Sequence, residues 1–243
     1  QVYLQVGRGK PDLDLPSALE LINVVGYTSA FQQLRTKEQL GYTVYTLLER
    51  GPPGKVTPAT ESNDDDELPH PGGPLAWSVV VQSPDKSPAE LEERIESWIG
   101  GFRAELAAMT DEAFETTVAS MISSVLRRER SMAEEAQILF GALSSRTHDF
   151  YRRYRKAEAY RRLTKEKVLE VFDACLAPGA PERRKLSLRV ASRRHRKTEE
   201  VETGGSGGGR DGGIVSRDDD EGTIVLTSLD DIREYKAGAS VYE

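Results

Sequence analysis

Four capping residues between positions 87 and 164 constrain the fold of this chain more than any other feature. Each is a serine or threonine that precedes apolar residues at helical spacing, and they are Ser87, Thr110, Ser131 and Thr164. At the first of them, Glu90 completes a capping box, and an apolar stripe follows from Leu91 to Leu106. Each cap contributes ~1 kcal/mol, so the agreement of caps with apolar stripes predicts a run of helices.

Strand patterns lie on both sides of these helices. Residues 2–7 alternate between apolar and polar side chains, and 186–190 repeat that pattern. The ranges 41–47 and 75–82 are rich in β-branched and aromatic residues and would form the two arms of a hairpin. A further helix would start at Asp14 and run to position 33. The order predicts an α+β fold, a two-layer α/β roll whose mixed, mostly antiparallel sheet has helices on one face.

Composition along the chain predicts one folded domain with polar extensions. The folded domain would span residues 1–192, interrupted at 49–74 by a segment with six prolines, four glycines and an acidic run. Such a segment buries too little apolar area to order itself, so we interpret it as a disordered insertion in the hairpin. Residues 193–222 would be a Gly-rich acidic linker, and 223–243 a short C-terminal segment that docks back.

Three sequence features indicate the compartment and the molecular context of the protein. The longest apolar stretch, near residues 19–31, is interrupted by polar side chains and too short to span a bilayer, so we expect no membrane partner. Cys175 is the only cysteine, which excludes an internal disulfide and fits a reducing compartment, so we expect a cytoplasmic protein with mitochondria as the alternative. Residue 1 is Gln and already belongs to a strand pattern, which suggests part of a larger polypeptide.

Common catalytic motifs are missing from the sequence. The three histidines, His70, His148 and His195, are far apart, and no H-E-x-x-H or H-x-x-E-H pair occurs. No G-x-S-x-G elbow supports a serine nucleophile. The glycines at 207, 209 and 212 match a dinucleotide-binding pattern, but no strand precedes them and no helix follows, so we interpret them as linker. A self-contained zinc peptidase is therefore not expected.

A basic region lies between residues 127 and 197, which hold 20 Lys/Arg and 9 Asp/Glu in a chain of net charge -7. One interpretation is a solvated helix face, and another is a site for acidic peptides or polyanions. Arginines also alternate with four aromatic residues, Phe150, Tyr151, Tyr154 and Tyr160. That pattern can suit single-stranded nucleic acid, but packing of helices explains the aromatic residues more simply, so we do not expect a nucleic-acid partner.

The run from Phe31 to Tyr42, with the sequence FQQLRTKEQLGY, places an arginine and a phenol where a helix gives way to a strand. This pairing suits binding of a peptide backbone. The run closely resembles the C-terminal half of the insulysin/pitrilysin family of zinc metallopeptidases, or inverzincins. The similarity continues through 83–98, 109–114, 163–166, 180–185 and 225–236. In that family two clam-shell halves each hold two α/β-roll domains of the LuxS/MPP-like metallopeptidase fold, and this chain resembles the fourth domain.

The resemblance implies a role for three residues of the run. Arg35 would donate hydrogen bonds to a substrate backbone carbonyl, and Tyr42 would donate its phenol O–H to the scissile carbonyl and the oxyanion that develops there. Phe31 would form a wall of the pocket for the residue after the cut. The family binds zinc in its first domain, so the resemblance implies no metal in this chain and an inactive chain on its own. Its partners would be peptide substrates and a zinc-bearing N-terminal half, on the same polypeptide or a separate subunit.

Two departures from the family pattern keep other functions open. The insertion at 49–74 replaces a shorter turn, and Arg127-Arg128-Glu129-Arg130 stands where insulysin has a Lys-Pro-Lys-Lys run linked to polyanion binding. Arg127, Arg128 and Arg130 are therefore candidate polyanion ligands. The first alternative function is a non-catalytic binding or assembly subunit of the same fold, like the core proteins related to the mitochondrial processing peptidase. The second is a polyanion-binding module.

Overall fold

The computed structural model describes residues 1–8, 13–50, 73–144, 148–191, 226 and 229–238. The chain divides into two compact units, Gln1–Ser192 and Arg193–Glu243. In the second unit only one helix is described, α8 (Leu229–Gly238), which falls within the expected C-terminal segment. The ranges 51–72 and 192–225 lie outside the described residues, and with them most of the expected insertion and the expected linker.

The first unit contains a four-stranded sheet in the order β2-β3-β1-β4. Its strands are β1 (Val2–Arg8), β2 (Thr43–Arg50), β3 (Pro74–Gln82) and β4 (Arg184–Ser187). β2 and β3 form the expected hairpin, but both strands are longer than the sequence suggested, since Glu49 pairs with Ala76 and Arg50 with Leu75. All strand pairs among the described residues are antiparallel, so the mixed sheet of the sequence prediction is refined to an antiparallel one.

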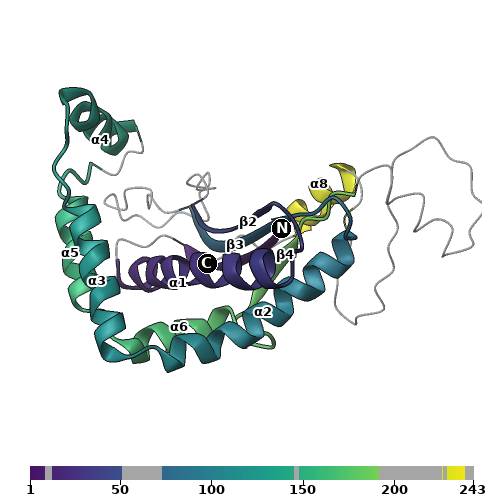
Figure 1. The fold of residues 1–243 in the computed structure, drawn as a ribbon. Helices are drawn as coiled ribbons and strands as arrows, with labels where there is room; N and C mark the ends of the chain where they lie inside the picture. The colour runs from purple at the N-terminus through teal and green to yellow at the C-terminus, as the bar shows by residue number, and fades with distance from the viewer. Residues whose placement is uncertain (9–12, 51–72, 145–147, 192–225, 227–228, 239–243) are drawn as a thin grey trace, which may run out of the picture. The chain divides into compact units, whose positions relative to one another are not determined.

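Seven helical segments accompany the sheet in the described part of the first unit (Figure 1). They are α1 (Asp14–Ala30), the π-helix η1 (Phe31–Lys37), α2 (Pro88–Ala108), α3 (Asp111–Val125), α4 (Met132–Ser144), α5 (Arg152–Arg161) and α6 (Lys165–Cys175). The predicted caps are present, because the hydroxyls of Ser87, Thr110, Ser131 and Thr164 each accept a backbone N–H three residues later. The α+β architecture expected from the sequence is confirmed.

An aromatic cluster joins the sheet to the helices on one of its faces. Trp77 of β3 lies 5.8 Å from Trp98 and 6.3 Å from Phe102 of α2, measured between ring centroids. Phe172 of α6 meets Phe102 edge-on at 5.8 Å. Gly26 lets α1 approach this cluster, since a Cβ there would lie 3.1 Å from the Trp77 ring. Aromatic pairs of this kind contribute about 0.5–1.5 kcal/mol each beyond the area they bury.

Hydrogen bonds fix α1 over the same cluster. The indole N–H of Trp77 donates to Asn23 Oδ1 at 3.1 Å, and that of Trp98 donates to Ser29 Oγ at 3.0 Å. Both acceptors lie on α1, so each tryptophan fills the core and also determines the position of the helix along its axis. α1 therefore carries the segment that follows it to a defined place beside β2.

The last strand is held by a buried carboxylate. Glu92 of α2 accepts hydrogen bonds from Ser187 and from Arg189 Nε (2.8 Å), and forms an ion pair with Lys185 Nζ at 2.6 Å. Burial raises the pKa of Glu92, but the hydrogen bonds from Arg189, Lys185 and Ser187 outweigh burial and bring it to about 2. The sequence placed this strand at 186–190, whereas β4 ends at Ser187. The apolar residues that suggested it are exposed, namely Leu186, Leu188 and Val190.

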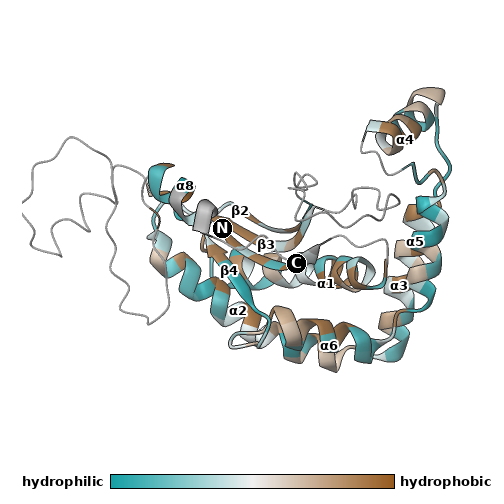
Figure 2. Ribbon diagram, turned by 180° about the vertical axis from the view of Figure 1, so that it is seen from behind, coloured by the Kyte–Doolittle hydropathy of each residue, from teal (hydrophilic) through white to brown (hydrophobic). Residues whose placement is uncertain are grey.

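The helices α3 and α5 lie side by side and form an arm that leads away from the sheet, with α4 at its end (Figures 1 and 2). Tyr160 at the base of the arm is buried, and its phenol donates to the carboxylate of Glu20 in α1. The same carboxylate pairs with Lys156 Nζ at 2.8 Å and Arg50 at 3.2 Å, which ties α5 to α1 and β2. No helix in the described part of the chain has the length and apolar character needed to cross a membrane.

The Glu92 cluster gives a pH-dependent stability prediction. Glu92→Gln removes the charge that pairs with Lys185 and Arg189, so the free energy of unfolding at pH 7 should fall by on the order of 2 kcal/mol. Because the folded pKa lies near 2 and the ordinary value near 4.5, this stabilisation exists above about pH 4.5 and is lost as the pH falls towards 2. Urea denaturation of wild type and variant at several pH values measures the difference.

The matched control is Glu93→Gln, because Glu93 is the exposed neighbour of Glu92 on α2. Its change should leave the unfolding free energy within ~0.5 kcal/mol of wild type at every pH. A Glu92 variant as stable as this control at pH 7 would show that the carboxylate does not hold β4.

Candidate functional site

Phe31, Arg35 and Tyr42 come together at the junction of η1 and β2. The guanidinium carbon of Arg35 lies 4.6 Å from the ring centroid of Phe31 and 4.8 Å from that of Tyr42. The cation is thus in contact with two aromatic rings, which restrains its position through cation–π attraction. The structure therefore joins the three residues that the sequence singled out into one group, here called the Arg35 cluster.

The polar groups of the Arg35 cluster are available for a ligand. Tyr42 is 83% exposed, and Phe31 and Arg35 are partly exposed. Within the described parts of the chain, neither the guanidinium of Arg35 nor the phenol of Tyr42 forms a hydrogen bond or ion pair with another residue. A guanidinium offers five N–H donors and a phenol one O–H donor, so the cluster presents donors to whatever carbonyl or carboxylate approaches.

The π-helix η1 determines how Phe31 and Arg35 are presented. Its widened turn is visible in the backbone, where the N–H of Glu38 bonds to the Gln33 carbonyl at 3.0 Å and that of Leu40 to the Leu34 carbonyl at 3.0 Å. π-helical turns are rare and are frequently found at functional sites. The sequence predicted an α-helix ending at Gln33, and the structure instead continues the helix as η1 to Lys37.

Glu38 clamps the end of η1 to α2. Its carboxylate accepts a hydrogen bond from Arg94 Nε at 2.7 Å and one from Gln33 Nε2 at 2.8 Å. Burial raises the pKa of Glu38, but these hydrogen bonds and the charge of Arg94 lower it further than burial raises it. No sequence pattern indicated a role for Glu38 or Arg94. Since the two residues are 56 positions apart, no local pattern could have paired them.

Gly41 brings Tyr42 close to the hairpin. A Cβ at this position would lie 1.9 Å from the carbonyl oxygen of Gln82 and 3.0 Å from the Cα of Ser83, so only glycine fits. Gln39, two residues earlier, has φ of 52°, a left-handed conformation that is uncommon outside glycine. The backbone between η1 and β2 is therefore fixed on both sides, and Tyr42 is exposed on a constrained segment instead of a loose loop.

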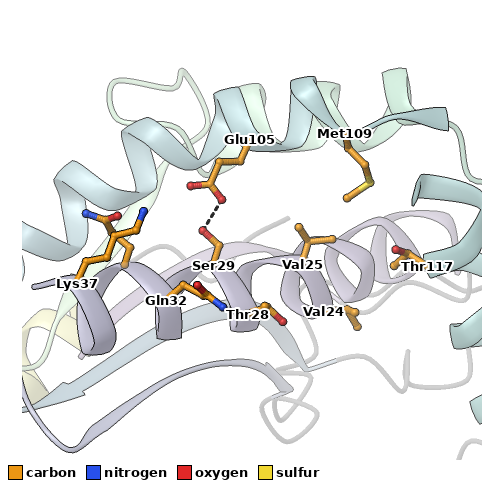
Figure 3. A pocket seen from close by; sticks show the side chains of 10 residues that line it. Val24, Val25, Thr28, Ser29, Gln32, Lys37, Glu105, Met109 and Thr117 are labelled. Carbon is orange, nitrogen blue, oxygen red and sulfur yellow. Dashed lines mark hydrogen bonds between the residues drawn. The ribbon is translucent and has the colours of Figure 1, made fainter. Parts of the chain in front are cut away.

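A groove of about 520 Å³ runs along the neighbouring face of α1 and η1, between them and α2 and α3 (Figure 3). Its lining is mostly uncharged, with Val24, Thr28 and Thr117 among its residues, and Lys37 is its one cation. The single carboxylate there, Glu105, already accepts a hydrogen bond from Ser29 at 2.6 Å. The groove does not include Arg35 or Tyr42, and its groups do not form an acid–base pair, so the Arg35 cluster remains the candidate site.

The candidate polyanion ligands lie elsewhere, in the connection between α3 and α4. Arg127, Arg128 and Arg130 are exposed, and none of their guanidinium groups has an ion pair among the residues that the structure describes. The acidic residue between them, Glu129, pairs with Arg153 of α5. The aromatic residues of the basic region also differ from the sequence interpretation, because helix packing buries only Tyr160. Three remain exposed, namely Phe150, Tyr151 and Tyr154.

A metal site is not found in the described residues, where no group of three or more His, Cys, Asp or Glu side chains could hold an ion. His148 is exposed, and Cys175 is buried beside Glu182, which together with burial raises the pKa of its thiol. These residues do not fit the donor set of a zinc centre.

The chain is similar to known proteins in both sequence and fold. A family model described as "PQQ synthase PqqF-like, C-terminal lobe domain 4" matches residues 73–140. The chain is 29% identical over 195 residues to "Insulin-degrading enzyme-like 1, peroxisomal" of Arabidopsis thaliana, which covers 80% of the chain and 18% of that protein. It is 28% identical over 175 residues to the insulin-degrading enzyme of Homo sapiens, covering 72% of the chain and 15% of that protein. The chain thus spans less than a fifth of the length of these relatives.

Solved structures show the same fold. Pitrilysin superposes with a TM-score of 0.56 at 22% identity, over 72% of this chain and 16% of pitrilysin. The inactive peptidase domain of a Bordetella parapertussis protein superposes with a TM-score of 0.50 at 11% identity, over 79% of this chain and 93% of that domain. The α/β roll inferred from the sequence is therefore the fold that these two structures share.

The close approach at Gly41 leads to a prediction for two glycines. Gly41→Ala should lower the free energy of unfolding by about 2 kcal/mol, because the new methyl group pushes the start of β2 away from Gln82. Gly101→Ala is the control, since a Cβ at Gly101 of α2 would meet nothing within 4 Å, and it should raise stability by ~0.5–1 kcal/mol. Denaturant titrations of the two variants measure both values. Equal stability of both variants would mean that Gly41 does not constrain the segment that carries Tyr42.

Proposed function

We propose that this chain, which belongs to the insulysin/pitrilysin family of zinc peptidases as a domain of their C-terminal half, binds the peptide substrate of a larger zinc metalloendopeptidase. The observation that carries this proposal is the contact of Arg35 with the rings of Phe31 and Tyr42, with both polar groups open to a ligand. The peptide would be enclosed between two halves of the protein. The Arg35 cluster would then be the contribution of this half to the active site.

Arg35 would hold the substrate backbone. Its guanidinium can donate two parallel N–H bonds to one peptide carbonyl or to neighbouring carbonyls, and contact with two rings limits the entropy lost when these bonds form. Phe31, whose ring also contacts the cation, would form a wall of the pocket for the residue after the cut bond. This arrangement favours a peptide in a defined register over one that is bound only by charge.

Tyr42 would act on the scissile bond itself. Its O–H can donate to the carbonyl oxygen of that bond, and the hydrogen bond strengthens as negative charge develops on the oxygen during attack. A donor that is fixed before the reaction starts needs no reorganisation in the transition state. The constraints at Gly41 and Gln39 support this role, because they fix the backbone that carries the phenol.

The rest of the reaction would depend on the other half. Zinc, when bound there, would supply the activated water, and the residues described here do not fit a zinc site. The relatives are more than four times as long as this chain, which supports a partner half on the same polypeptide or on a separate subunit. The chain alone would therefore bind peptides without cleaving them.

A non-catalytic binding subunit of the same fold is the alternative function. It is favoured by one comparison, since a domain with the same fold is described as an inactive peptidase domain. Such a subunit would use Arg35 and Phe31 to hold a peptide but would have no role for a phenol O–H. The two functions therefore predict different effects when the phenol oxygen of Tyr42 is removed: the peptidase would lose activity, and the binding subunit would keep its affinity for the peptide.

Tyr42→Phe provides the test. In the chain combined with its zinc-bearing half, the variant should lower kcat for a quenched fluorescent peptide by about 10²–10³-fold, because one donor to the developing oxyanion is lost. The peptide Kd should change little, since the ring at this position still contacts Arg35. Tyr235→Phe, which alters an exposed phenol on α8, is the control and should leave both constants unchanged. Equal kcat for wild type and Tyr42→Phe would exclude the phenol from the reaction.

Arg35→Lys tests the other half of the cluster. Lysine keeps the charge but lacks the planar fork, so kcat/KM should fall by roughly tenfold through weaker peptide binding. Stability should be nearly unchanged because Arg35 is partly exposed. If the Arg35→Lys variant kept the wild-type kcat/KM, the fork geometry would have no part in recognition and Arg35 would act only as a positive charge.

A further inference from the structure

The sheet has a second face, which points away from α1, α2 and α6. Side chains at alternate positions of β2 reach α1, because Thr46 Oγ1 donates to the Asn23 carbonyl and Arg50 pairs with Glu20. The intervening side chains lie on the opposite face, and they belong to residues 43, 45, 47 and 49. Figure 1 shows the three helices together on one side of the sheet. We call the other side the outer face.

The strand register arranges the side chains of the outer face in rows. Tyr3 of β1 is paired with Leu186 of β4 and with Ser78 of β3, and Ser78 is paired in turn with Leu47 of β2. Tyr45 precedes Leu47 on the same face of β2. Tyr3, Tyr45 and Leu47 are each partly exposed, so the outer face offers aromatic and aliphatic surface to a ligand.

Glu49 is the only acidic residue in the four described strands, and it lies on the outer face. Its Oε1 accepts hydrogen bonds from Gln1 Nε2 at 2.7 Å and from the hydroxyl of Ser78. Its Oε2 accepts none from the residues that the structure describes, and no Lys or Arg among them forms an ion pair with this carboxylate. Two neutral donors therefore fix the carboxylate in place without neutralising its charge.

The carboxylate of Glu49 calls for a positively charged ligand group. Burial is the main cause that raises the pKa of the Tyr3 phenol, and the charge of Glu49 raises it further, so this charge acts across the outer face. Because Oε1 is already fixed, little conformational entropy would be lost when a ligand binds to Oε2. Hydrogen bonds from a cation to a carboxylate are among the strongest in proteins. Charge complementarity therefore favours a lysine or arginine side chain.

Glu49 and the Arg35 cluster lie at opposite ends of β2. Tyr42 comes directly before the first residue of the strand, and Glu49 is its last residue but one. At a rise of ~3.3 Å per residue, the strand carries Glu49 about 23 Å away from Tyr42. An extended peptide has nearly the same rise, so a peptide that is held at Tyr42 and continues along β2 would reach Glu49 with about its seventh residue from the cut bond.

We propose that the outer face of β2 binds the peptide substrate beyond the Arg35 cluster, and that Glu49 selects a lysine or arginine about seven residues from the cut bond. This deepens the proposed function and rests on it, because it assumes that a peptide is held at the Arg35 cluster. Tyr45 and Leu47 would contact the intervening part of the peptide. Glu49 is then a specificity-determining residue that takes no part in the cleavage step.

The experiment uses the chain assembled with its zinc-bearing half and two sets of quenched fluorescent peptides. In the first set a single lysine is moved stepwise along the peptide on both sides of the cut bond, and in the second set glutamine takes its place. For wild type, kcat/KM should favour lysine over glutamine by about tenfold at a position near the seventh residue. The preference should appear in KM with kcat unchanged, because Glu49 would bind the ground state and the transition state equally.

Glu49→Gln is the decisive variant, because its amide oxygen can still accept the hydrogen bonds from Gln1 and Ser78 and so keep the local structure. The preference for lysine should disappear in this variant. Glu93→Gln, which removes the same charge from an exposed position on α2, is the matched control and should keep the preference. A preference that survives in Glu49→Gln would overturn the proposal. Equal kcat/KM of wild type for the two sets at every position would overturn it as well.

Tyr42→Phe separates this proposal from the catalytic one. It should lower kcat for both sets alike and leave the ratio between them unchanged. Non-cleavable versions of the same peptides give a readout that does not depend on cleavage. Wild type should bind the lysine version about tenfold more tightly than the glutamine version, and Glu49→Gln should bind both with the same Kd. Equal Kd values for wild type would exclude the role of Glu49, whatever the result for Tyr42.

Discussion

The packing of α1 against Trp77 determines where the rest of this domain can place its functional groups. Gly26 permits the contact, since any larger side chain would meet the Trp77 ring at 3.1 Å, and Asn23 accepts the indole hydrogen bond. With α1 fixed along its axis, η1 begins at a defined point beside β2, and Phe31 and Arg35 project towards Tyr42. A displacement of α1 by a fraction of a turn would separate the guanidinium from one of its two rings. The packing of the core therefore determines the geometry of the candidate site.

The site combines a constrained backbone with exposed polar groups. The clamp of Glu38 on Arg94, the left-handed Gln39 and the close approach at Gly41 restrict the chain on both sides of Tyr42. Ordinary loops of this exposure gain mobility, and a catalytic donor loses effect when it can move away. These three constraints cost conformational freedom and stabilise little core, which fits a segment shaped for function more than for stability.

Local sequence predicted much of the fold, because caps and apolar periodicity are local properties. Ser87 and Thr164 capped helices as expected, and β1, β2 and β3 followed their patterns. The π-helix was not predicted in this way, and the Glu38–Arg94 contact at its end joins residues 56 positions apart, which no local pattern can pair. The exposure of the apolar residues of β4 and α4 could not be predicted either, because periodicity indicates an apolar face but not what covers it. For the site, family resemblance selected Phe31, Arg35 and Tyr42, while their stacking came only from the structure.

The most direct measurement of the central claim is the side-chain NMR signal of Arg35 in the assembled two-half protein, observed at Nε–Hε while a non-cleavable peptide analogue is added. Recognition of the substrate backbone by the Arg35 cluster predicts a saturable shift of this signal, together with a shift of the Tyr42 ring resonances at the same peptide concentration. Binding of the analogue with both signals unmoved would contradict the account, because the peptide would then be held elsewhere on the protein.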